Sequence, residues 1–439
     1  MSNELQFSSL SLELTKELSL KIKKDNGIYF TPKSIIKKTI DIIKSIPDYT
    51  DTIKFKTILE PSCGSCEFIK YITQEFTDKN LNITAIEFND IIYQKISKLN
   101  FVENTNNTIK FINKDYMTYD NNNEKMYDLI IGNPPYFVMN KDDVNSNSNL
   151  KEYSNFYDGR PNIFILFIIH SLKKLNINGV LAFILPKSFI NCLYYNKLRK
   201  HIYENYKIID IIDCFNDDCN IYLETKQETI IFVIQKINQL ELELKELKEL
   251  NKVYVYEIKD YVIFNTIENI KLINKLYENS TTLDDLGFDV KVGNIVWNQH
   301  KDKLTNDESK TLLIYSSNIK NNKLEIIDYD NDEKKKYITL EGKKEPLLVL
   351  NRGYGKGKYV FNYCLINSDS DSEKPYLIEN HLICLINKNK KLKKEEVIKK
   401  YNELIKSFTD KKTKEFVSLF FGNNAVNTTE LKYILPIYH

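Results

Sequence analysis

The residues best suited to chemistry lie in one short string, Asn133-Pro134-Pro135-Tyr136, which closely follows the apolar run 127–131. The two prolines fix φ and carry no N–H donor, so the carbonyls of Asn133 and Pro134 are held rigidly. The Asn133 side-chain oxygen and the Pro134 carbonyl can then both accept from one planar –NH₂ group. Because the Tyr136 ring offers a stacking face, the string predicts a site for an amino group on a flat heterocycle. A plain strand-ending turn is the alternative.

The string resembles the catalytic Asn-Pro-Pro-Tyr motif of class I S-adenosylmethionine-dependent amino-methyltransferases, particularly the gamma-class DNA adenine methyltransferases of the TaqI type. The resemblance runs in order over about residues 27–237. It implies a Rossmann-like fold with a seven-stranded, mostly parallel sheet. It also implies S-adenosyl-L-methionine as cofactor, S-adenosyl-L-homocysteine as product, and methyl transfer to the exocyclic N6 of an adenine in double-stranded DNA.

Segment 58–68 is predicted to form a strand, a tight turn and a helix start, and it resembles the family's first motif. Small residues in such a turn let backbone amides at a helix N-terminus approach the carboxylate of the cofactor. Cys66 stands where the family usually has Gly, so we expect an altered turn there. Glu87 ends the following strand, where an acid is suited to holding the ribose hydroxyls.

Further segments follow the family's order. Segment 27–32 resembles the tenth motif, which covers the methionine end of the cofactor, and 114–116 resembles the third motif, whose carboxylate accepts from the cofactor's adenine amine. Segment 159–167 resembles the helix beside that adenine, with a plain core helix as the alternative, and 179–189 and 197–199 resemble the next strand and helix. The resemblance assigns cofactor binding to Tyr29, Thr31, Glu60, Ser62, Cys63, Gly64, Glu87, Phe88, Asp115, Tyr116, Asn133, Pro135 and Phe167.

The resemblance also implies a second aromatic that clamps the target base just before the strand at 229–234. Tyr222 is the favoured candidate, and Phe215 stays open because an insertion at 217–219 leaves the register undetermined. A base inside a duplex cannot meet the methyl group in line, so we expect it to be flipped out. Orientation and electrostatics carry the catalysis, and no side-chain base of matched pKa is required. The implied catalytic residues are Asn133, Pro134, Pro135, Tyr136 and Tyr222.

Seven short β-rich runs must position these residues, at 56–59, 81–86, 108–112, 127–131, 180–185, 208–212 and 229–234. Amphipathic helical patterns between them predict an α/β domain built round a largely parallel sheet. A low-complexity charged run at 240–250 breaks the pattern, and we interpret it as a solvated linker or surface helix, with partner contact as the alternative. The predicted organisation is a catalytic domain at 1–240, a linker at 241–251 and a mixed α+β domain at 252–439, which by resemblance is a DNA target-recognition domain.

In this second domain, segment 351–359 combines cations, flexible glycines and aromatic rings, a composition suited to phosphate contact and close approach to a groove. A solvated loop is the alternative. The residues predicted to bind DNA are Arg352, Tyr354, Lys356 and Lys358.

Composition narrows the remaining classes. A chain of 439 residues with 42% apolar and 28% charged residues is too long for one small module and is typical of a soluble globular protein. Its 62 basic and 60 acidic residues give a net charge of +2, so a DNA surface must come from local clustering. Cys63 and Cys66 lack a second ligand pair, so no metal site is expected. The odd number of seven cysteines suits a reducing compartment.

The longest apolar stretch, 163–169, is far shorter than the roughly 20 residues that span a bilayer. We therefore expect a cytoplasmic, prokaryotic or virus-encoded monomer with no membrane contact and, as partner, a separate restriction endonuclease. Two alternatives stay open. A related methyltransferase would act on an RNA base or a protein glutamine, and a non-catalytic nucleic-acid-binding subunit would have kept the fold without the reaction.

Overall fold

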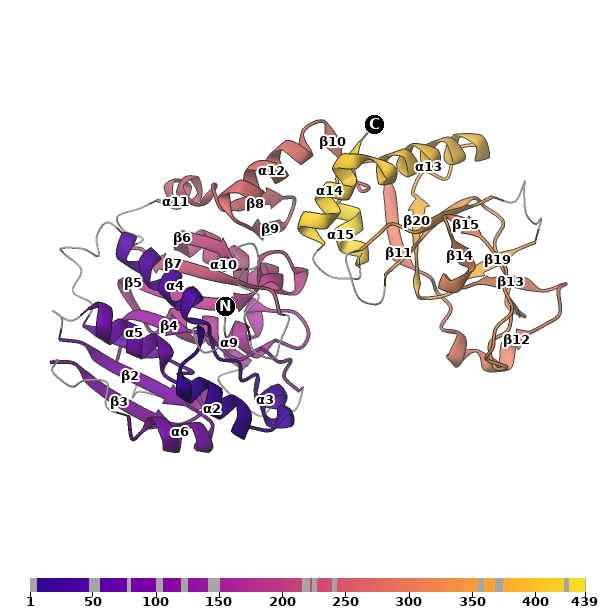
Figure 1. The fold of residues 1–439 in the computed structure, drawn as a ribbon. Coiled ribbons are helices and arrows are strands. Elements are labelled where there is room, and N and C mark those ends of the chain that lie inside the picture. The colour runs from indigo at the N-terminus through magenta and orange to yellow at the C-terminus, as the bar shows by residue number, and fades with distance from the viewer. Residues whose placement is uncertain are drawn as a thin grey trace. The chain divides into compact units, whose positions relative to one another are not determined.

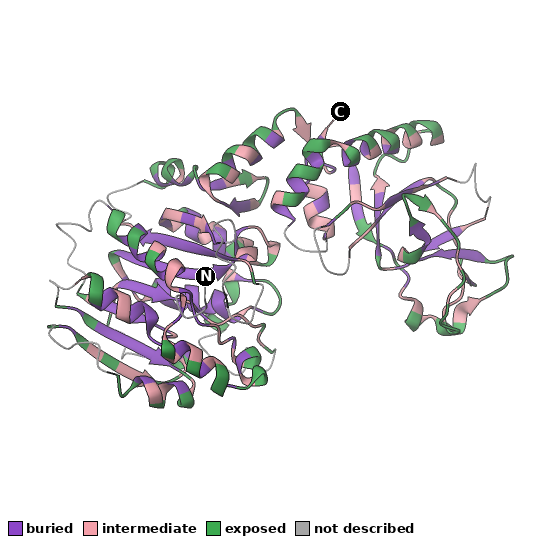
Figure 2. Cartoon of the chain, in the orientation of Figure 1, coloured by how far each residue is buried: buried purple, intermediate pink, exposed green. Residues whose placement is uncertain are grey.

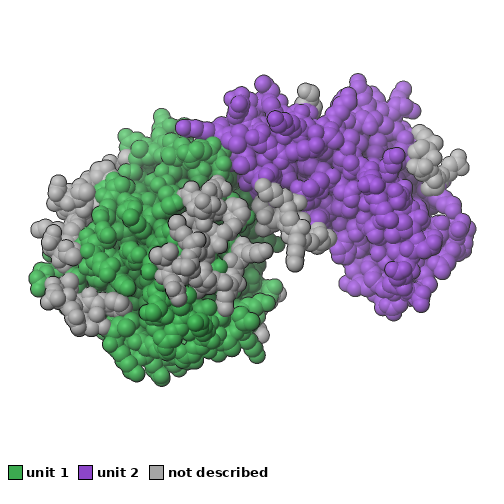
Figure 3. Space-filling model, viewed as in Figure 1, with its two compact units in different colours: residues 1–270 green, residues 271–439 purple. Residues whose placement is uncertain are grey.

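The computed structural model describes residues 6–46, 56–76, 80–99, 106–119, 125–140, 151–214, 222, 227–238, 243–353, 359–367, 374–421 and 426–438. The chain forms two compact units, Met1–Ile270 and Lys271–His439 (Figure 3).

The first unit is built around a seven-stranded sheet with the strand order β3-β2-β1-β4-β5-β7-β6 (Figure 1). Strand β7 is antiparallel to both of its neighbours, and the other pairs are parallel. All seven predicted runs are strands of this sheet, which confirms the predicted fold class. The strands are β1 (Thr57–Glu60), β2 (Asn82–Glu87), β3 (Thr108–Asn113), β4 (Tyr127–Gly132), β5 (Leu175–Pro186), β6 (Tyr206–Asp213) and β7 (Thr229–Lys236).

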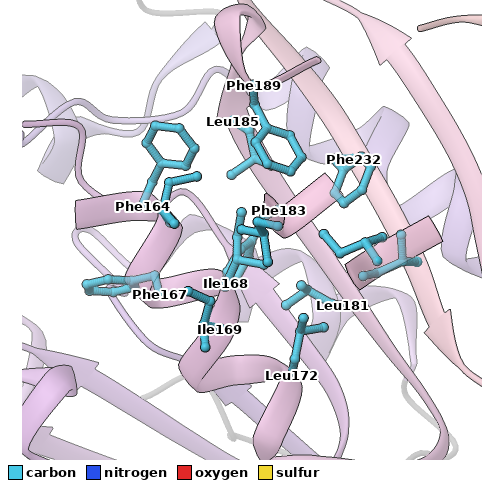
Figure 4. Packing of buried hydrophobic residues seen from close by; sticks show 14 of the residues in the cluster. Phe164, Phe167, Ile168, Ile169, Leu172, Leu181, Phe183, Leu185, Phe189 and Phe232 are labelled. Atoms are coloured by element: carbon cyan, nitrogen blue, oxygen red, sulfur yellow. The ribbon is translucent and has the colours of Figure 1, made fainter. Parts of the chain in front are cut away.

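Helices cover both faces of this sheet, so its central strands are buried along nearly their whole length (Figure 2). On one face, Ile36, Ile69 and Ile92 of three different helices join one hydrophobic core. On the other face, Phe164 packs with Phe183 of β5 in a second core, shown in Figure 4. The helices of this unit are α2 (Ser9–Glu17), α3 (Leu20–Asn26), α4 (Lys33–Ser45), α5 (Glu67–Glu75), α6 (Asp90–Ile96), α9 (Ile163–Lys173), α10 (Asn196–Asn205) and α11 (Leu244–Asn251).

Most of the predicted linker, residues 244–251, forms α11 of the first unit. Buried Asn251, at the end of α11, accepts from the Ile208 N–H at 2.8 Å through Oδ1. The hairpin of β8 (Val255–Ile258) and β9 (Tyr261–Phe264) follows, and the Val262 carbonyl accepts from Nε of fully buried Arg199 at 2.6 Å. Because these contacts fasten residues 244–264 to α10 and β6, the compact units divide after Ile270 rather than at the predicted boundary.

The second unit has the mixed α+β content that the sequence predicts. Its two four-stranded sheets have the orders β11-β20-β17-β18 and β12-β16-β13-β19. Its elements begin within α12 (Ile267–Tyr277) and continue with β10 (Ser280–Thr281), β11 (Phe288–Val292), β12 (Leu304–Thr305), β13 (Thr311–Ile314), β14 (Ile319–Lys320), β15 (Lys323–Leu324), β16 (Tyr337–Ile338), β17 (Leu347–Asn351), β18 (Tyr363–Ile366), β19 (Tyr376–Ile378), β20 (Leu382–Asn387), α13 (Lys394–Thr409), α14 (Lys411–Phe420), α15 (Thr428–Tyr433) and β21 (Ile437–Tyr438). Among the described helices of the whole chain, none is long and apolar enough to cross a membrane.

Candidate active site

A cavity of about 790 Å³ lies at the carboxyl ends of β1 to β4, where the parallel strands bring their last residues to one edge of the sheet. This volume suits a ligand of cofactor size. The predicted cofactor residues that line it are Tyr29, Ser62, Gly64, Glu87, Phe88, Asp115, Tyr116, Asn133, Pro135 and Phe167.

The turn between β1 and α5 lies within the first-motif segment, residues 58–68. The Cys66 N–H donates to the Cys63 carbonyl at 2.7 Å, and Cys66 adopts the left-handed conformation with φ 62° just before α5 begins. Cys66, which stands where the family usually has Gly, therefore adopts a conformation that favours glycine. The Gly64 N–H points to the next strand and donates to Glu87 Oε2 at 2.9 Å.

Glu87 is buried at the end of β2, with both carboxylate oxygens engaged. Oε2 accepts from Gly64 as described, and Oε1 accepts from the Asn89 N–H at 2.8 Å. Burial raises the pKa of Glu87 to about 7, against the lowering effect of these backbone donors. The carboxyl group is therefore balanced between its neutral and ionised forms near neutral pH.

Thr31, Glu60 and Cys63 do not line the cavity. Burial, together with the negative charge of Glu87, raises the pKa of Glu60 well above its usual value. Glu60 Oε2 is a buried atom with no hydrogen-bond partner among the described residues. The Cys63 N–H donates to the carbonyl of Ile86, so this residue links β1 to β2 through its backbone. Thr31 instead contacts Asn133, the residue that follows β4.

Asn133 is held by the segment that precedes α4. Its Nδ2 donates to the Tyr29 carbonyl at 3.2 Å and to Thr31 Oγ1 at 3.0 Å. A backbone carbonyl can only accept, so this contact assigns the nitrogen to that side of the amide and turns Oδ1 the other way. Its backbone carbonyl accepts from Ser62 Oγ at 3.2 Å. Among the described residues, no donor reaches the carbonyl of Pro134.

Tyr136 contacts the oxygen of the same Asn133 side-chain amide. Its hydroxyl lies 2.5 Å from Asn133 Oδ1 and 2.8 Å from the Ile184 carbonyl, and its single proton can serve one of them at a time. Its backbone nitrogen would lie 2.7 Å from a Cβ at Gly27, which has φ +62°. Only a residue without a side chain fits there, so segment 27–31 packs directly on the Asn-Pro-Pro-Tyr string.

Three aromatic residues also line the cavity. Phe88 is 62% exposed, whereas Tyr116 and Phe167 are buried, with their rings 5.0 Å apart at an interplanar angle of 52°. Asp115 caps the short helical turn that follows it, because its Oδ1 accepts from the Met117 N–H at 2.9 Å.

The aromatic candidates for the second clamp differ in what the structure describes. Tyr222 is half-buried, and its hydroxyl accepts from Thr229 Oγ1 at 3.4 Å, at the start of β7. Burial raises the pKa of Tyr136 well above its usual value, and nearby Tyr222 and Cys214 raise it further. Tyr136 contacts the Ile184 carbonyl near the end of β5, and Thr229, which contacts Tyr222, pairs with Pro186 at the end of the same strand, so the two tyrosines lie at one edge of the sheet. Phe215 lies outside the described residues.

Of the predicted DNA-binding residues, only Arg352 is described. It is half-buried, and its carbonyl accepts from the Val426 N–H at 2.9 Å. Tyr354, Lys356 and Lys358 lie outside the described residues.

Several lining residues are absent from the sequence prediction. Phe137, Val138 and Met139 directly follow the Asn-Pro-Pro-Tyr string, and Lys24 lies just before the predicted motif at 27–32. Their adjacency in sequence to those motifs is the signal that could have identified them. Within the described ranges, no group of three or more His, Cys, Asp or Glu residues is arranged to hold a metal ion.

Comparison with known proteins gives one family match. The model for the "Eco57I restriction-modification methylase" family matches residues 3–222. The type II methyltransferase M.CvrRI of Paramecium bursaria Chlorella virus XZ-6E is 27% identical over 436 residues, which is 98% of this chain and 99% of that protein. The modification methylase CviBIII of Paramecium bursaria Chlorella virus NC1A is 25% identical over 99% of this chain and 100% of that protein. A solved DrdV–DNA complex covers 93% of this chain and 54% of that chain, with 13% identity and a TM-score of 0.48.

Proposed function

The chain belongs to the Eco57I restriction-modification methylase family, whose cofactor is S-adenosylmethionine and whose substrate is DNA, and we propose that it methylates the exocyclic N6 of an adenine flipped out of the duplex. The observation that carries the proposal is the assigned orientation of the Asn133 amide. Tyr29 and Thr31 hold its nitrogen, so Oδ1 faces away from them. An amino group bound at this point meets an acceptor rather than a donor.

The target amine is proposed to donate one N–H to Asn133 Oδ1 and the other to the Pro134 carbonyl. An adenine amine is a poor nucleophile because its lone pair is delocalised into the ring. Two fixed acceptors favour the tetrahedral form of the nitrogen, whose lone pair is available for attack, and they cost no reorganisation at the moment of reaction.

Tyr136 must give up its contact with Asn133 when the amine arrives. Its hydroxyl has a second acceptor in the Ile184 carbonyl at 2.8 Å, so it can release Oδ1 without losing a hydrogen bond. The ring then offers the face on which the flipped base stacks, with Tyr222 as the second ring on the same edge of the sheet.

The residues lining the cavity fit S-adenosylmethionine at three points. Glu87 is placed for the ribose hydroxyls, and Phe88, Tyr116 and Phe167 provide apolar surface for the adenine ring. At the methionine end, Ser62 and Gly64 of the first-motif segment line the cavity. When bound, the cofactor supplies a methyl group on a sulfonium leaving group.

The second unit is proposed to recognise the DNA sequence, with segment 351–359 contributing phosphate and groove contacts. A monomer acting beside a separate restriction endonuclease is the proposed arrangement. The recognition proposal is supported by the second compact unit, and the endonuclease proposal by the family's restriction-modification character.

The deciding experiment incubates the full chain with labelled S-adenosylmethionine and random-sequence duplex DNA, followed by nucleoside analysis. We expect all label in N6-methyladenine and within one short sequence. Label in cytosine would overturn the choice of base, and label only in RNA or protein of a host lysate would overturn the substrate.

A further inference from the structure

Glu379 and His381 form a close pair at the turn between β19 and β20 of the second unit. His381 Nδ1 lies within hydrogen-bonding distance of Glu379 Oε1, and the His381 backbone N–H donates to Oε2 of the same carboxylate at 3.0 Å. The Glu379 side chain is 2% exposed, whereas the His381 side chain is 47% exposed. Burying a carboxylate is costly unless it is well paired. Here the buried carboxylate holds the backbone and the ring of an exposed histidine in one orientation.

The turn that carries this pair is anchored from two sides. The Glu379 N–H donates to the Ile314 carbonyl at 3.0 Å, and the Asn380 N–H donates to the Ile295 carbonyl at 2.9 Å. A Cβ at Gly293 would lie 2.2 Å from the Glu379 carbonyl oxygen, so the end of β11 reaches this turn only because residue 293 is glycine. The backbone of residues 379–381 is therefore held in place as well as the His381 ring.

The turn adjoins the segment that is predicted to contact DNA. Asn351, the last residue of β17, pairs with Leu382 of β20, and the backbone N–H of the next residue, Arg352, lies 3.5 Å from the His381 carbonyl. Arg352 directly follows β17, and His381 directly precedes β20. The arginine and the oriented histidine therefore lie next to each other where these two paired strands end.

We infer that His381 contacts a base edge of the DNA substrate and helps to determine the recognised sequence, with Glu379 as the positioning residue for its ring. The inference rests on the proposed function. A phosphate accepts hydrogen bonds from many directions and carries no sequence information, so it has no need of a ring fixed by a buried carboxylate. A base edge does need fixed geometry, because its donors and acceptors have set positions.

The contact with Glu379 occupies Nδ1, so Nε2 is the ring nitrogen available to pair with a base edge. Nε2 accepts a hydrogen bond in the neutral ring and donates one in the protonated ring. In the major groove, an acceptor matches the amino groups of adenine N6 and cytosine N4, and a donor matches guanine N7 and O6. The chemical class of ligand is therefore a base pair that presents a hydrogen-bonding group in the major groove, and the base whose preference is lost in His381→Ala identifies which of the two it is.

The test maps methylated sites on random-sequence duplex DNA by single-molecule sequencing, with the full-length wild-type chain and the variants His381→Ala and Glu379→Gln. We expect wild type to require one base at each recognised position. His381→Ala should relax the preference at one position by about tenfold or more and leave the other positions unchanged. Glu379→Gln keeps the size of the side chain and should relax the same position to a smaller extent. His300→Ala, a histidine in the same unit, serves as the matched control and should keep the wild-type preference.

Two results would overturn the inference alone. One is an unchanged preference for His381→Ala, and the other is a uniform loss at all sites, which would indicate a phosphate contact. A melting curve for each variant separates loss of folding from loss of recognition, and the exposed His381 makes its alanine variant the decisive one. Absence of methyl transfer to DNA by the wild-type chain would instead overturn the proposed function, and the inference with it.

Discussion

The side-chain nitrogen of Asn133 donates to Thr31 Oγ1 at 3.0 Å, although 102 positions separate the two residues. The same nitrogen donates to the Tyr29 carbonyl, and Gly27 packs against the backbone of Tyr136. The segment expected to cover the cofactor therefore also orients the residue expected to accept from the target amine. The proposed cofactor binding and the proposed base positioning thus depend on one segment, 27–31.

Asn133→Ala removes a proposed acceptor for the amine while leaving the backbone string in place. We expect methyl transfer to fall at least about 100-fold, the usual effect of losing one oriented transition-state hydrogen bond, and cofactor affinity to change little. Labelled-cofactor turnover and cofactor titration measure the two effects separately. Near-normal turnover in Asn133→Ala would remove the assignment.

Thr31→Val replaces the hydroxyl that accepts from Asn133 with a methyl group of similar size. The Tyr29 carbonyl still holds the amide, so we expect a loss of about fivefold in kcat, equivalent to about 1 kcal/mol for one hydrogen bond. The cofactor KM should stay within about twofold of wild type. Thr39→Val removes a buried hydroxyl that bonds only within α4, and it should leave kcat unchanged. A rise in the cofactor KM with kcat unchanged would show that Thr31 serves the cofactor and not Asn133.

Glu87 should make cofactor binding depend on pH. Burial raises its pKa to about 7, and we expect only the ionised carboxylate to accept well from both ribose hydroxyls. Cofactor affinity should therefore fall by up to about tenfold for each pH unit below 7. Titrations between about pH 5.5 and 8.5 should show this slope in wild type and a weaker, flat affinity in Glu87→Gln. An equal slope in the variant would assign the titration to another group.

The same group affects stability with a defined sign. Its pKa in the folded state lies above the usual 4.5, so the folded protein favours the neutral form. This contribution to the free energy of unfolding is fully present below about pH 4.5 and is lost as the pH rises through about 7. Denaturant unfolding at several pH values should show that loss in wild type and not in Glu87→Gln.

Cys66 tests the unusual first-motif turn. Its φ of 62° favours glycine, but its side chain is fully buried in the core beneath α5. Glycine and alanine both remove the thiol, and only alanine keeps the backbone strain. We therefore expect Cys66→Gly to be more stable than Cys66→Ala by about 1 kcal/mol. Equal unfolding free energies for the two variants would contradict a strained turn.

The extent of the first unit can be tested with fragments. A chain ending at residue 270 keeps the acceptor for Arg199 Nε and the side chain of Asn251, whereas a chain ending at 240 loses both. Arg199 is fully buried and its pKa is lowered to about 10 by burial, so removing its acceptor leaves a costly charge. We expect cooperative thermal unfolding for 1–270 and none for 1–240. A cooperative 1–240 fragment would restore the boundary that the sequence predicts.

Much of the catalytic unit follows from local signals. The seven strand runs and the Pro-Pro string depend on side-chain patterning and on restricted backbone angles, which act over a few residues. Parallel strands then bring their carboxyl ends to one edge, so the order of motifs along the chain predicts which side chains gather at the cavity. This is why most of the predicted cofactor residues line it.

The amino-acid sequence by itself determined the strands, the motif order and the fixed backbone of the Asn133-Pro134-Pro135 string, because each rests on short-range stereochemistry. Only the tertiary structure decided that Thr31 contacts Asn133 instead of the cavity, that residues 244–264 belong to the first unit, and that Glu379 orients His381. These are contacts whose partners are chosen by packing. Their free energy depends on burial and on the pairing of polar groups, which exist only once distant segments have come together.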